Sequence, residues 1–410
     1  MDASRRQFVT WLGASALLAS RQASPNHTPR FDTTDVRAAF DFSEERVPMN
    51  AANLCPSPRR VAEEVARYTR LIDTDPSFQN RARFDALLEA SRQAVAAPLG
   101  VSPDEVALVR NTSEANNIIN NGLDLAPRDE IVIWEENHPT NNVAWQVRAR
   151  RFGLVVKTVS LPANAQSVDA LVSPFRQAIG PRTRVLTVTH VSNVSGLKLP
   201  LAELANLCRD RNIHFHVDGA QTWGAIDVNL AEIGCHSFSG SAHKWFMGPK
   251  EVGLLYVRAD AIERIWPNTV APGWGDDADT DLIGARKLES LGQRDDAALA
   301  AVATAAALHA QVGSANVARH TQRLAQRLKE GLVEAGATLV TPMDPALSGG
   351  VVVVGVAAEH RAALFDRLYR EHGIIGAPTG GLRLCPHLYN TDAHVDRAVD
   401  GVRALREYLT

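Results

Sequence analysis

Cysteine and long apolar runs are scarce in this sequence of 410 residues, and each shortage argues against a class of protein. The four cysteines, Cys55, Cys208, Cys235 and Cys385, show no Cys-x-x-Cys spacing, so neither a zinc ribbon nor a dense disulfide framework is indicated. Cys208 falls on the apolar side of "LAELANLCRD", where we expect it to be buried as a small hydrophobic residue. Beyond the N-terminal segment no stretch approaches about 18 consecutive apolar residues, so we expect a soluble mature protein.

An excess of charge of either sign is also missing. The sequence has 43 Lys and Arg residues against 46 Asp and Glu residues, which gives a net charge of −3. This balance provides no basic field for nucleic acid or an anionic membrane, and we expect neither as a partner. Hydrophobic residues make up 45% and charged residues 22%, values typical of a soluble globular enzyme with room for two domains.

The first residues resemble an export signal. In "SRRQFVTWLGASALLAS", Arg5 and Arg6 precede Phe8 and an apolar run that is too short and too mild to span a bilayer. We predict a twin-arginine signal peptide over residues 1–24 and a periplasmic protein. The alternative is a disordered tail on a cytoplasmic protein. Apart from export, we expect no membrane partner.

After a polar arm at residues 25–58, apolar strands alternate with amphipathic helices. The predicted strands lie at residues 130–134, 154–161, 184–192, 213–219 and 252–257. A helix is predicted within residues 199–212, and its position between two strands makes a βαβ unit, which implies a parallel sheet. Ligands of such sheets bind beyond the carboxyl ends of the strands.

The composition changes near residue 275, and we predict a domain boundary there. Residues 59–275 would form a large domain and residues 276–410 a smaller α+β domain. The smaller domain contains alanine-rich helical stretches, a buried strand at "VVVVGV" and a terminal helix from about Asp392.

Asp218 follows the predicted strand "IHFHV", and a carboxylate at the end of a buried strand needs a partner to offset its desolvation. One suitable partner is the protonated ring nitrogen of pyridoxal 5′-phosphate (PLP), since PLP enzymes need a carboxylate there. A metal ion is the alternative, because His214, His216 and Asp218 share one face of the strand. We favour core hydrogen bonds for the two histidines and no metal site, since Asp218 is followed by Gly-Ala-Gln rather than by another ligand.

The stretches "HVDGAQ" and "SFSGSAHKWFMGPKEVGLLYV" resemble the class V aminotransferases, a family of fold-type I PLP-dependent enzymes. The resemblance covers roughly residues 45–410. It implies an α/β fold with a mostly parallel, seven-stranded type of sheet in the large domain, a smaller C-terminal α+β domain and a homodimer. It also implies that Lys244 is catalytic and holds PLP as a Schiff base, while Asp218 contacts the ring nitrogen.

Three segments of the family pattern would contact the phosphate and the face of the ring. "VRNTSEANN" resembles the turn that opens a helix onto the PLP phosphate, so Thr112 and Ser113 are expected to bind it. Ser241 and His243, which flank the lysine motif, are expected to face the same phosphate. "ENHPTNNVAWQ" resembles the segment whose histidine, here His138, stacks on the pyridine ring.

Three further residues complete the implied site. "HVSNVSG" offers Asn193 beside the 3′ oxygen of the ring, with Gln221 close by. "GLRLCPHLYNT" resembles the C-terminal signature of the family, so Arg383 is expected to bind the substrate carboxylate through two parallel hydrogen bonds.

The sequence also departs from the family pattern. Cysteine desulfurases carry a catalytic cysteine before the final arginine, whereas "HGIIGAPTGGLR" has none, which disfavours a persulfide mechanism at that loop. Many relatives have "GTRD", whose threonine reaches the phosphate in the neighbouring subunit, and here Gln293 takes its place. The "VPMNAANLCPSP" arm resembles the N-terminal segment of isopenicillin N epimerase-like proteins.

The resemblance implies chemistry at the Cα of an amino acid, free or within a small peptide. Aminotransferase-type chemistry is our first prediction. The alternatives are epimerisation and β-elimination, including C–S lyase chemistry, because the same residues serve all three. A metal-dependent hydrolase using the HxHxD run and a PLP-binding protein without catalysis are less favoured.

Overall fold

The computed structural model describes residues 36–162, 167–271 and 283–410. The predicted signal peptide at residues 1–24 and the predicted boundary at residues 275–276 lie outside these ranges. Both stay predictions. Among the described residues no single helix is long and apolar enough to cross a membrane, and one bent pair of helices passes by length and composition only.

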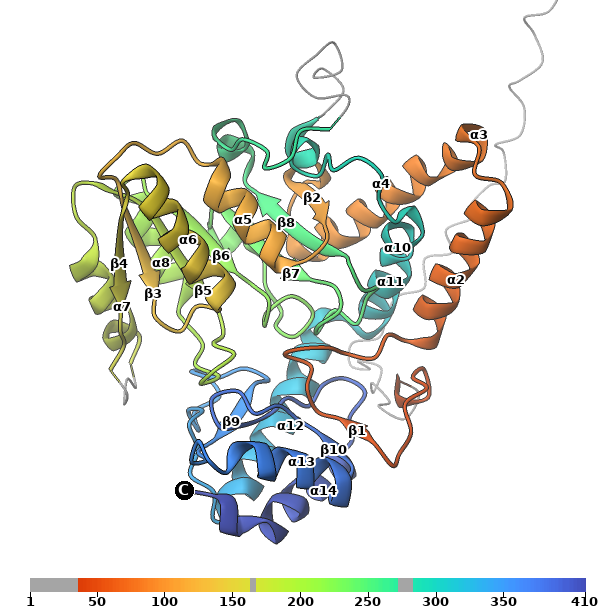
Figure 1. The fold of residues 1–410 in the computed structure, drawn as a ribbon, viewed down its shortest axis with the longest axis vertical. Helices are drawn as coiled ribbons and strands as arrows, with labels where there is room; N and C mark the ends of the chain where they lie inside the picture. Colours follow the sequence, from red (N-terminus) through yellow and green to blue (C-terminus); the bar gives the residue numbers. More distant parts are fainter. Residues whose placement is uncertain (1–35, 163–166, 272–282) are drawn as a thin grey trace, which may run out of the picture. The chain divides into compact units, whose positions relative to one another are not determined.

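A seven-stranded sheet with strand order β2-β8-β7-β6-β5-β3-β4 organises the larger part of the chain (Figure 1). Its strands are β2 (Val106–Val109), β3 (Glu130–Trp134), β4 (Val155–Val159), β5 (Thr183–Thr189), β6 (His214–Asp218), β7 (Ser237–Ser241) and β8 (Gly253–Val257). The ladders from β4 through to β7 are parallel, and β8 runs antiparallel to both of its neighbours. The predicted α/β fold with a mostly parallel seven-stranded sheet is confirmed.

Helices cover both faces of this sheet. The helices of this larger part are α2 (Arg59–Thr74), α3 (Phe78–Arg81), α4 (Arg83–Ala96), α5 (Thr112–Gly122), α6 (Pro139–Phe152), α7 (Val168–Ala178), α8 (Leu201–Arg209), α9 (Leu230–Ile233), α10 (Asp296–Ala300) and α11 (Val302–Val312). The C-terminal part contains α12 (Ser314–Glu334), α13 (Arg361–His372) and α14 (Asp392–Ala404). Successive strand residues point to opposite faces. Val132 packs into the core under α7 and α8, whereas Ile131 and Ile133 pack with α5 and α6. Cys208 lies in the first of these cores, as expected.

The five strands predicted for the sheet are confirmed, but two others were missed. β2 is only four residues long, and β7 has the sequence SFSGS, which carries no strand pattern. All five residues of β7 are nevertheless buried, because β6 and β8 pair with its two edges. The hydroxyls of Ser237 and Ser239 are hydrogen-bonded, so a polar strand can lie in the core.

The C-terminal part has its own core. It is formed by α12, α13 and α14 with β9 (Val352–Val354), β10 (Ile374–Ile375) and β11 (Leu382–Leu384). β1 (Val47–Pro48), from the N-terminal arm, pairs in parallel with β10. The terminal helix predicted from about Asp392 is confirmed as α14.

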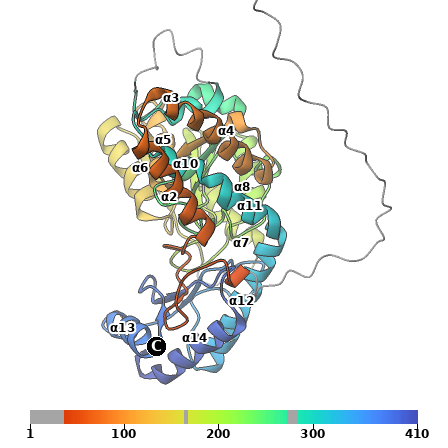
Figure 2. The same ribbon diagram turned by 90° about the vertical axis from the view of Figure 1, so that its right-hand side faces the viewer.

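Helices α10 and α11 follow the predicted boundary but pack on the sheet side. Figures 1 and 2 show both helices beside α4, and Ala298 and Val302 belong to the sheet core. After the predicted boundary, the first helix that contributes to the C-terminal core is α12, which starts at Ser314. The predicted division of the chain into domains stays a prediction, and this packing favours a boundary near Gly313.

The loop between β5 and α8 is clamped against the C-terminal part. Leu197 forms a β-bridge with Ser348. Gly196 has φ +75°, and a Cβ added there would lie 2.4 Å from the carbonyl oxygen of Val351. Only glycine allows this conformation and this approach together. The clamp matters because the same loop carries Asn193.

Replacing Gly196 with alanine should therefore lower the free energy of unfolding by more than the about 1–3 kcal/mol of backbone strain alone. Gly336→Ala is the matched control, because Gly336 has φ +92° with nothing within 4 Å of an added Cβ. Urea unfolding of both variants measures the difference. Equal losses would show that the close approach to Val351 contributes nothing.

Candidate active site

Asp218 lies at the carboxyl end of β6 and is 1% exposed. Its Oδ2 accepts a hydrogen bond from Asn116 Nδ2 (2.9 Å), and its Oδ1 accepts one from the backbone N–H of Ala220 (3.0 Å). The side-chain oxygen of Asn116 accepts from Ser239 Oγ (2.6 Å) and His216 Nε2 (2.9 Å). Asn116 is therefore held with its amide nitrogen toward Asp218, and the carboxylate is fixed in one orientation.

The HxHxD run makes core hydrogen bonds. His214 Nε2 and His216 Nδ1 both contact Ser237 Oγ, at 2.9 and 2.8 Å. Burial lowers the pKa of His216 to about 3, so this ring stays neutral. Within the described part of the chain no group of three or more His, Cys, Asp and Glu side chains could hold a metal ion. These contacts support the favoured interpretation of the two histidines.

Lys244 lies on the loop that follows β7, half-buried, and its Nζ donates no hydrogen bond to any described residue. Burial lowers the pKa of Lys244, the positive charge of Arg383 lowers it further, and Asp218 raises it. A larger share of the amine is therefore neutral than at an exposed lysine. The neutral amine is the form that can react with a carbonyl group or accept a proton.

The aromatic residues beside Lys244 anchor its loop. Trp245 Nε1 donates to Gln221 Oε1 (2.7 Å), and the Trp245 carbonyl accepts from His387 Nε2 (2.6 Å). Phe246 stacks on Trp223 with ring centroids 4.1 Å apart. The motif "HKWF" thus places one reactive amine on a loop whose backbone is held by the contacts of Trp245 and Phe246.

Hydroxyl groups gather at the N-terminus of α5. Thr112 donates its backbone N–H to Ser241 Oγ (2.9 Å), and the two side-chain oxygens are 2.7 Å apart. Ser113 follows in the first helical turn and is partly exposed. Helix N-termini attract anions because their N–H groups and the helix dipole point outward. The predicted phosphate-binding residues Thr112, Ser113 and Ser241 therefore come together at a suitable place.

His138 caps the N-terminus of α6. Its Nδ1 accepts the backbone N–H of Thr140 (3.3 Å), so the neutral ring carries its proton on Nε2. Burial lowers the pKa of His138, as do Lys244 and Arg383, while Asp218 raises it. The four predicted groups His138, Lys244, Asp218 and Arg383 thus influence one another electrostatically.

Arg383 lies on β11 and is 4% exposed. Its Nη1 donates to the backbone oxygen of Asn193 and its Nη2 to Asn50 Oδ1, both at 3.1 Å. Arg383 Nε and Asn193 Oδ1 are buried and have no hydrogen-bond partner among the described residues. Buried polar atoms rarely remain unpaired, so both point to a polar ligand.

Three predicted residues are placed differently from this cluster. Gln221 uses both ends of its amide within the protein, because its Nε2 also donates to the carbonyl of Ala52 (3.1 Å). The His243 ring makes no hydrogen bond to a described residue, and burial together with Lys244 and Lys250 lowers its pKa to about 4. Gln293 is exposed and donates to the Arg294 carbonyl (2.9 Å).

Sequence reasoning missed Asn116 and Asn50. Asn116 carried a usable signal, because it follows Thr112 by four residues and must share its face of α5. Asn50 carried none, since its partner Arg383 is 333 residues away in the chain.

The sequence model of the aminotransferase class-V family matches residues 52–386. The chain belongs to this family. An isopenicillin N epimerase of Streptomyces clavuligerus is 31% identical over 391 residues, which cover 91% of this class-V chain and 98% of that protein. An isopenicillin N epimerase of Amycolatopsis lactamdurans is 32% identical over 87% of the chain and 94% of its own length. A cysteine desulfurase of Klebsiella pneumoniae subsp. pneumoniae is 28% identical over 79% and 84%.

Solved structures share the fold of this class-V protein. The apo structure of a cysteine desulfurase from Thermococcus onnurineus NA1 gives a TM-score of 0.82 at 23% identity, covering 92% of this chain and 98% of that chain. A C-DES variant with glycine covalently linked to its PLP cofactor gives 0.81 at 22% identity, covering 90% and 98%. Class-V proteins are fold-type I, PLP-dependent enzymes, and this chain is therefore one of them.

The described residues fit PLP. Lys244 offers an unpaired amine, Asp218 a fixed carboxylate, and the N-terminus of α5 a site for a phosphate. In the same cluster, Asn193 Oδ1 can accept a hydrogen bond and Arg383 Nε can donate one, since neither has a partner among the described residues.

Truncating Asn116 tests how this cluster is held. Asn116→Ala removes one donor from the buried Asp218 and two interactions from Ser239 and His216, so the free energy of unfolding should fall by about 2–4 kcal/mol. PLP affinity should fall as well. Asn117→Ala is the matched control, because among the described residues the side chain of Asn117 donates only to the Ser113 carbonyl on the same helix. Urea unfolding of the apoproteins and PLP titration measure both effects, and equal losses in the two variants would contradict the role of Asn116.

Proposed function

We propose that this enzyme binds PLP at Lys244 and acts at the Cα of an amino acid, free or within a small peptide, by aminotransferase-type chemistry. The observation that carries the proposal is the unpaired amine of Lys244, with its lowered pKa, in one electrostatic cluster with Asp218 and Arg383. When bound, PLP withdraws electron density from the Cα of an attached amino acid.

The residues that would hold PLP come from five segments. Asp218 would accept a hydrogen bond from the ring nitrogen, His138 would lie on the ring, and Asn193 would contact the 3′ oxygen. The remaining candidates would face the phosphate, and they are Thr112, Ser113, Ser241 and, from the loop beside Lys244, His243. Gln221 supports the site by holding Trp245, next to Lys244.

Substrate would be oriented by Arg383 and deprotonated by Lys244. The buried Nε–H of Arg383 has no partner among the described residues, and a substrate carboxylate would accept a hydrogen bond from it. With the carboxylate fixed there, the neutral amine of Lys244 can take the proton from Cα and return it elsewhere.

Epimerisation is the second candidate function. It is favoured by the two isopenicillin N epimerases, whose similarity to this chain extends over nearly their whole length. Desulfurase chemistry has less support. Residues 372–383 contain no cysteine, and burial raises the pKa of Cys55 and of Cys235 to about 12. Buried thiols of this kind are poor nucleophiles.

A product assay separates these reactions. The purified protein would be incubated with a panel of amino acids and short peptides in deuterated water. Keto-acid release would support transamination, inversion at Cα with deuterium uptake would support epimerisation, and loss of a β-substituent would support elimination. A protein that exchanges no Cα proton on any substrate would contradict the proposal.

A homodimer and a periplasmic location complete the proposal. Gln293 is exposed, and the family pattern suggests that its side chain contacts a neighbouring subunit. Periplasmic location depends on the predicted twin-arginine signal at residues 1–24.

Borohydride labelling tests the attachment site. The wild-type protein should be yellow, and reduction should abolish the visible band and fix PLP on the peptide that contains Lys244. Lys244→Ala should lose this label and at least about 10³-fold in turnover, because the covalent attachment and the base are removed together. Lys250→Ala, which changes an exposed lysine six residues away, should keep both. A label on any other lysine would contradict the assignment.

Arg383→Lys tests the carboxylate site. A lysine cannot form two parallel hydrogen bonds with a carboxylate, so kcat/KM should fall by the equivalent of about 1.5–3 kcal/mol with PLP binding nearly unchanged. Arg370→Lys, on the exposed surface of α13, is the control. If Arg383→Lys is silent, the substrate is anchored elsewhere.

A further inference from the structure

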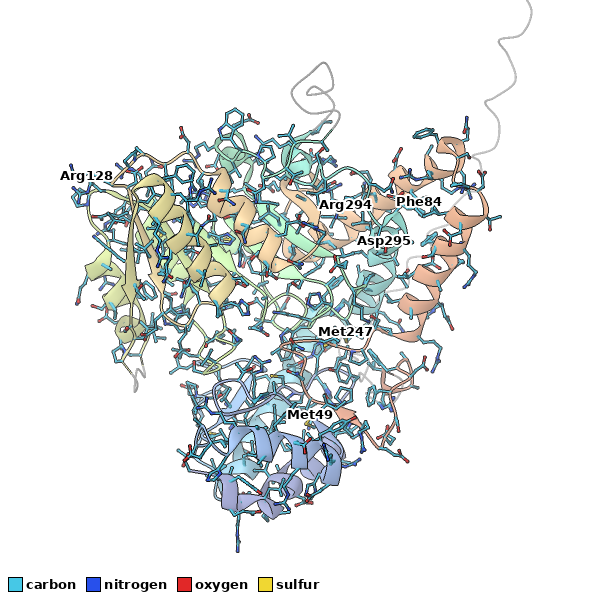
Figure 3. All side chains as sticks on the ribbon, viewed as in Figure 1. Met49, Phe84, Arg128, Met247, Arg294 and Asp295 are labelled. Atoms are coloured by element: carbon cyan, nitrogen blue, oxygen red, sulfur yellow. The ribbon has the colours of Figure 1, made fainter. Side chains whose placement is uncertain are left out.

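The arm segment, defined as residues 47–57, joins the two parts of the protein. On the C-terminal side, Met49 donates its backbone N–H to Ile375 O (2.9 Å). On the side of the sheet, Cys55 donates its backbone N–H to His243 O (2.8 Å), and Ser57 Oγ donates to Gly248 O (3.0 Å). Figure 3 shows Met247, on the loop that follows β7, in the larger part and Met49 of the arm segment in the C-terminal part, to whose core it belongs.

Asn50 lies in the middle of this segment and contacts Arg383 directly. Its Oδ1 accepts from Arg383 Nη2 at 3.1 Å. The backbone fixes this placement on both sides, because Cys385 donates to Met49 O (2.7 Å) and Ala51 donates to Cys385 O (3.3 Å). The amide of Asn50 therefore meets the guanidinium in a register that the backbone sets.

The hydrogen bonds of Arg383 leave one edge of the guanidinium free. A guanidinium has five N–H donors, and here the acceptors of Nη1 and Nη2 are neutral oxygens of Asn193 and Asn50. Nε is buried without a partner. No carboxylate of the described ranges forms an ion pair with Arg383. Asn50 thus orients the arginine without neutralising its charge.

We propose that Asn50 is a positioning residue that fixes Arg383 for the free α-carboxylate of the substrate and so selects acids over amides and esters. This inference rests on the proposed function and adds its substrate class, a compound with an unblocked α-carboxylate. A neutral amide is required at this position, because the carboxylate of an aspartate would itself form an ion pair with Arg383 and compete with the substrate carboxylate. A carboxylate from the substrate then completes the hydrogen bonds of Arg383.

The arm segment also connects this selection to the lysine loop. The carbonyl of Ala52, two residues after Asn50, accepts from Gln221, and Gln221 in turn accepts from Trp245 beside Lys244. A single stretch of backbone thus sets the positions of the carboxylate-binding arginine and of the loop that carries the reactive amine.

The test compares Asn50→Asp and Asn50→Ala with Asn53→Asp. Asn53 is exposed in the same segment, so its variant adds the same charge outside the site. Dissociation constants of α-amino acids and of the corresponding amides would be measured for each holoprotein from the change in visible absorbance. Thermal unfolding of each apoprotein would confirm that the variants fold.

We expect Asn50→Asp to lower the preference for acid over amide by about tenfold or more, since the introduced carboxylate would compete with the substrate for Arg383. Asn50→Ala should lower it less and raise KM more than it lowers kcat. Asn53→Asp should leave it at the wild-type value. A purely structural role would weaken acid and amide binding equally and leave their ratio unchanged.

Two results would overturn the inference. One is an equal acid-to-amide ratio in the wild type, Asn50→Asp and Asn53→Asp. The other is a wild-type protein that binds no amino acid of the panel more tightly than its amide. Failure of the proposed function looks different, because the wild type would then exchange no Cα proton on any substrate of the panel.

Discussion

The burial of the Asp218 carboxylate at the end of β6 is the constraint on which the rest of the site depends. Removing an ionised carboxylate from water costs several kcal/mol unless hydrogen bonds and charges compensate. Asn116 and the backbone of Ala220 supply the hydrogen bonds, and Lys244 and His138 lie within range of the negative charge. The polar strand β7 follows from the same need, because Ser239 fixes the amide of Asn116.

Burial also disfavours the charged form of Lys244, so it lowers the pKa of this side chain and favours the neutral amine. A reactive amine in a low-dielectric site must also be held in place, and the loop achieves this without hydrogen bonds to the amine itself. Trp245 and Phe246 anchor the backbone that follows Lys244, and the buried Met247 takes a left-handed conformation with φ +56°. Such a conformation persists only where the surroundings impose it. Rigidity therefore comes from the neighbours of Lys244, and its side chain remains free to react.

The sequence predicts the strands and helices better than it predicts the side-chain contacts between distant segments. Five strands of the large sheet and the helix beginning at Asp392 follow from local apolar patterns, which the structure confirms. Strand β7 does not, because its serines are buried only through partners on other segments. For the site, motif spacing predicted Lys244 and Asp218, and the structure brings the two into one electrostatic cluster. It could not identify Asn50, since its contact with Arg383 depends on how distant segments pack. The periodicity of apolar residues along the chain holds no information about contacts between residues that are far apart in sequence.

The charge of Arg383 links substrate recognition to the basicity of Lys244. Burial lowers the pKa of Lys244 and of His138, and without substrate the unneutralised guanidinium of Arg383 lowers both further. A carboxylate bound to Arg383 would cancel most of this repulsion, so the pKa of Lys244 would rise as the substrate binds. By linkage, the amine would then bind a proton more strongly only when a Cα proton is at hand. An aspartate in place of Asn50 would remove this coupling, because it would cancel the charge permanently. The neutral acceptors around Arg383 thus serve both recognition and proton transfer.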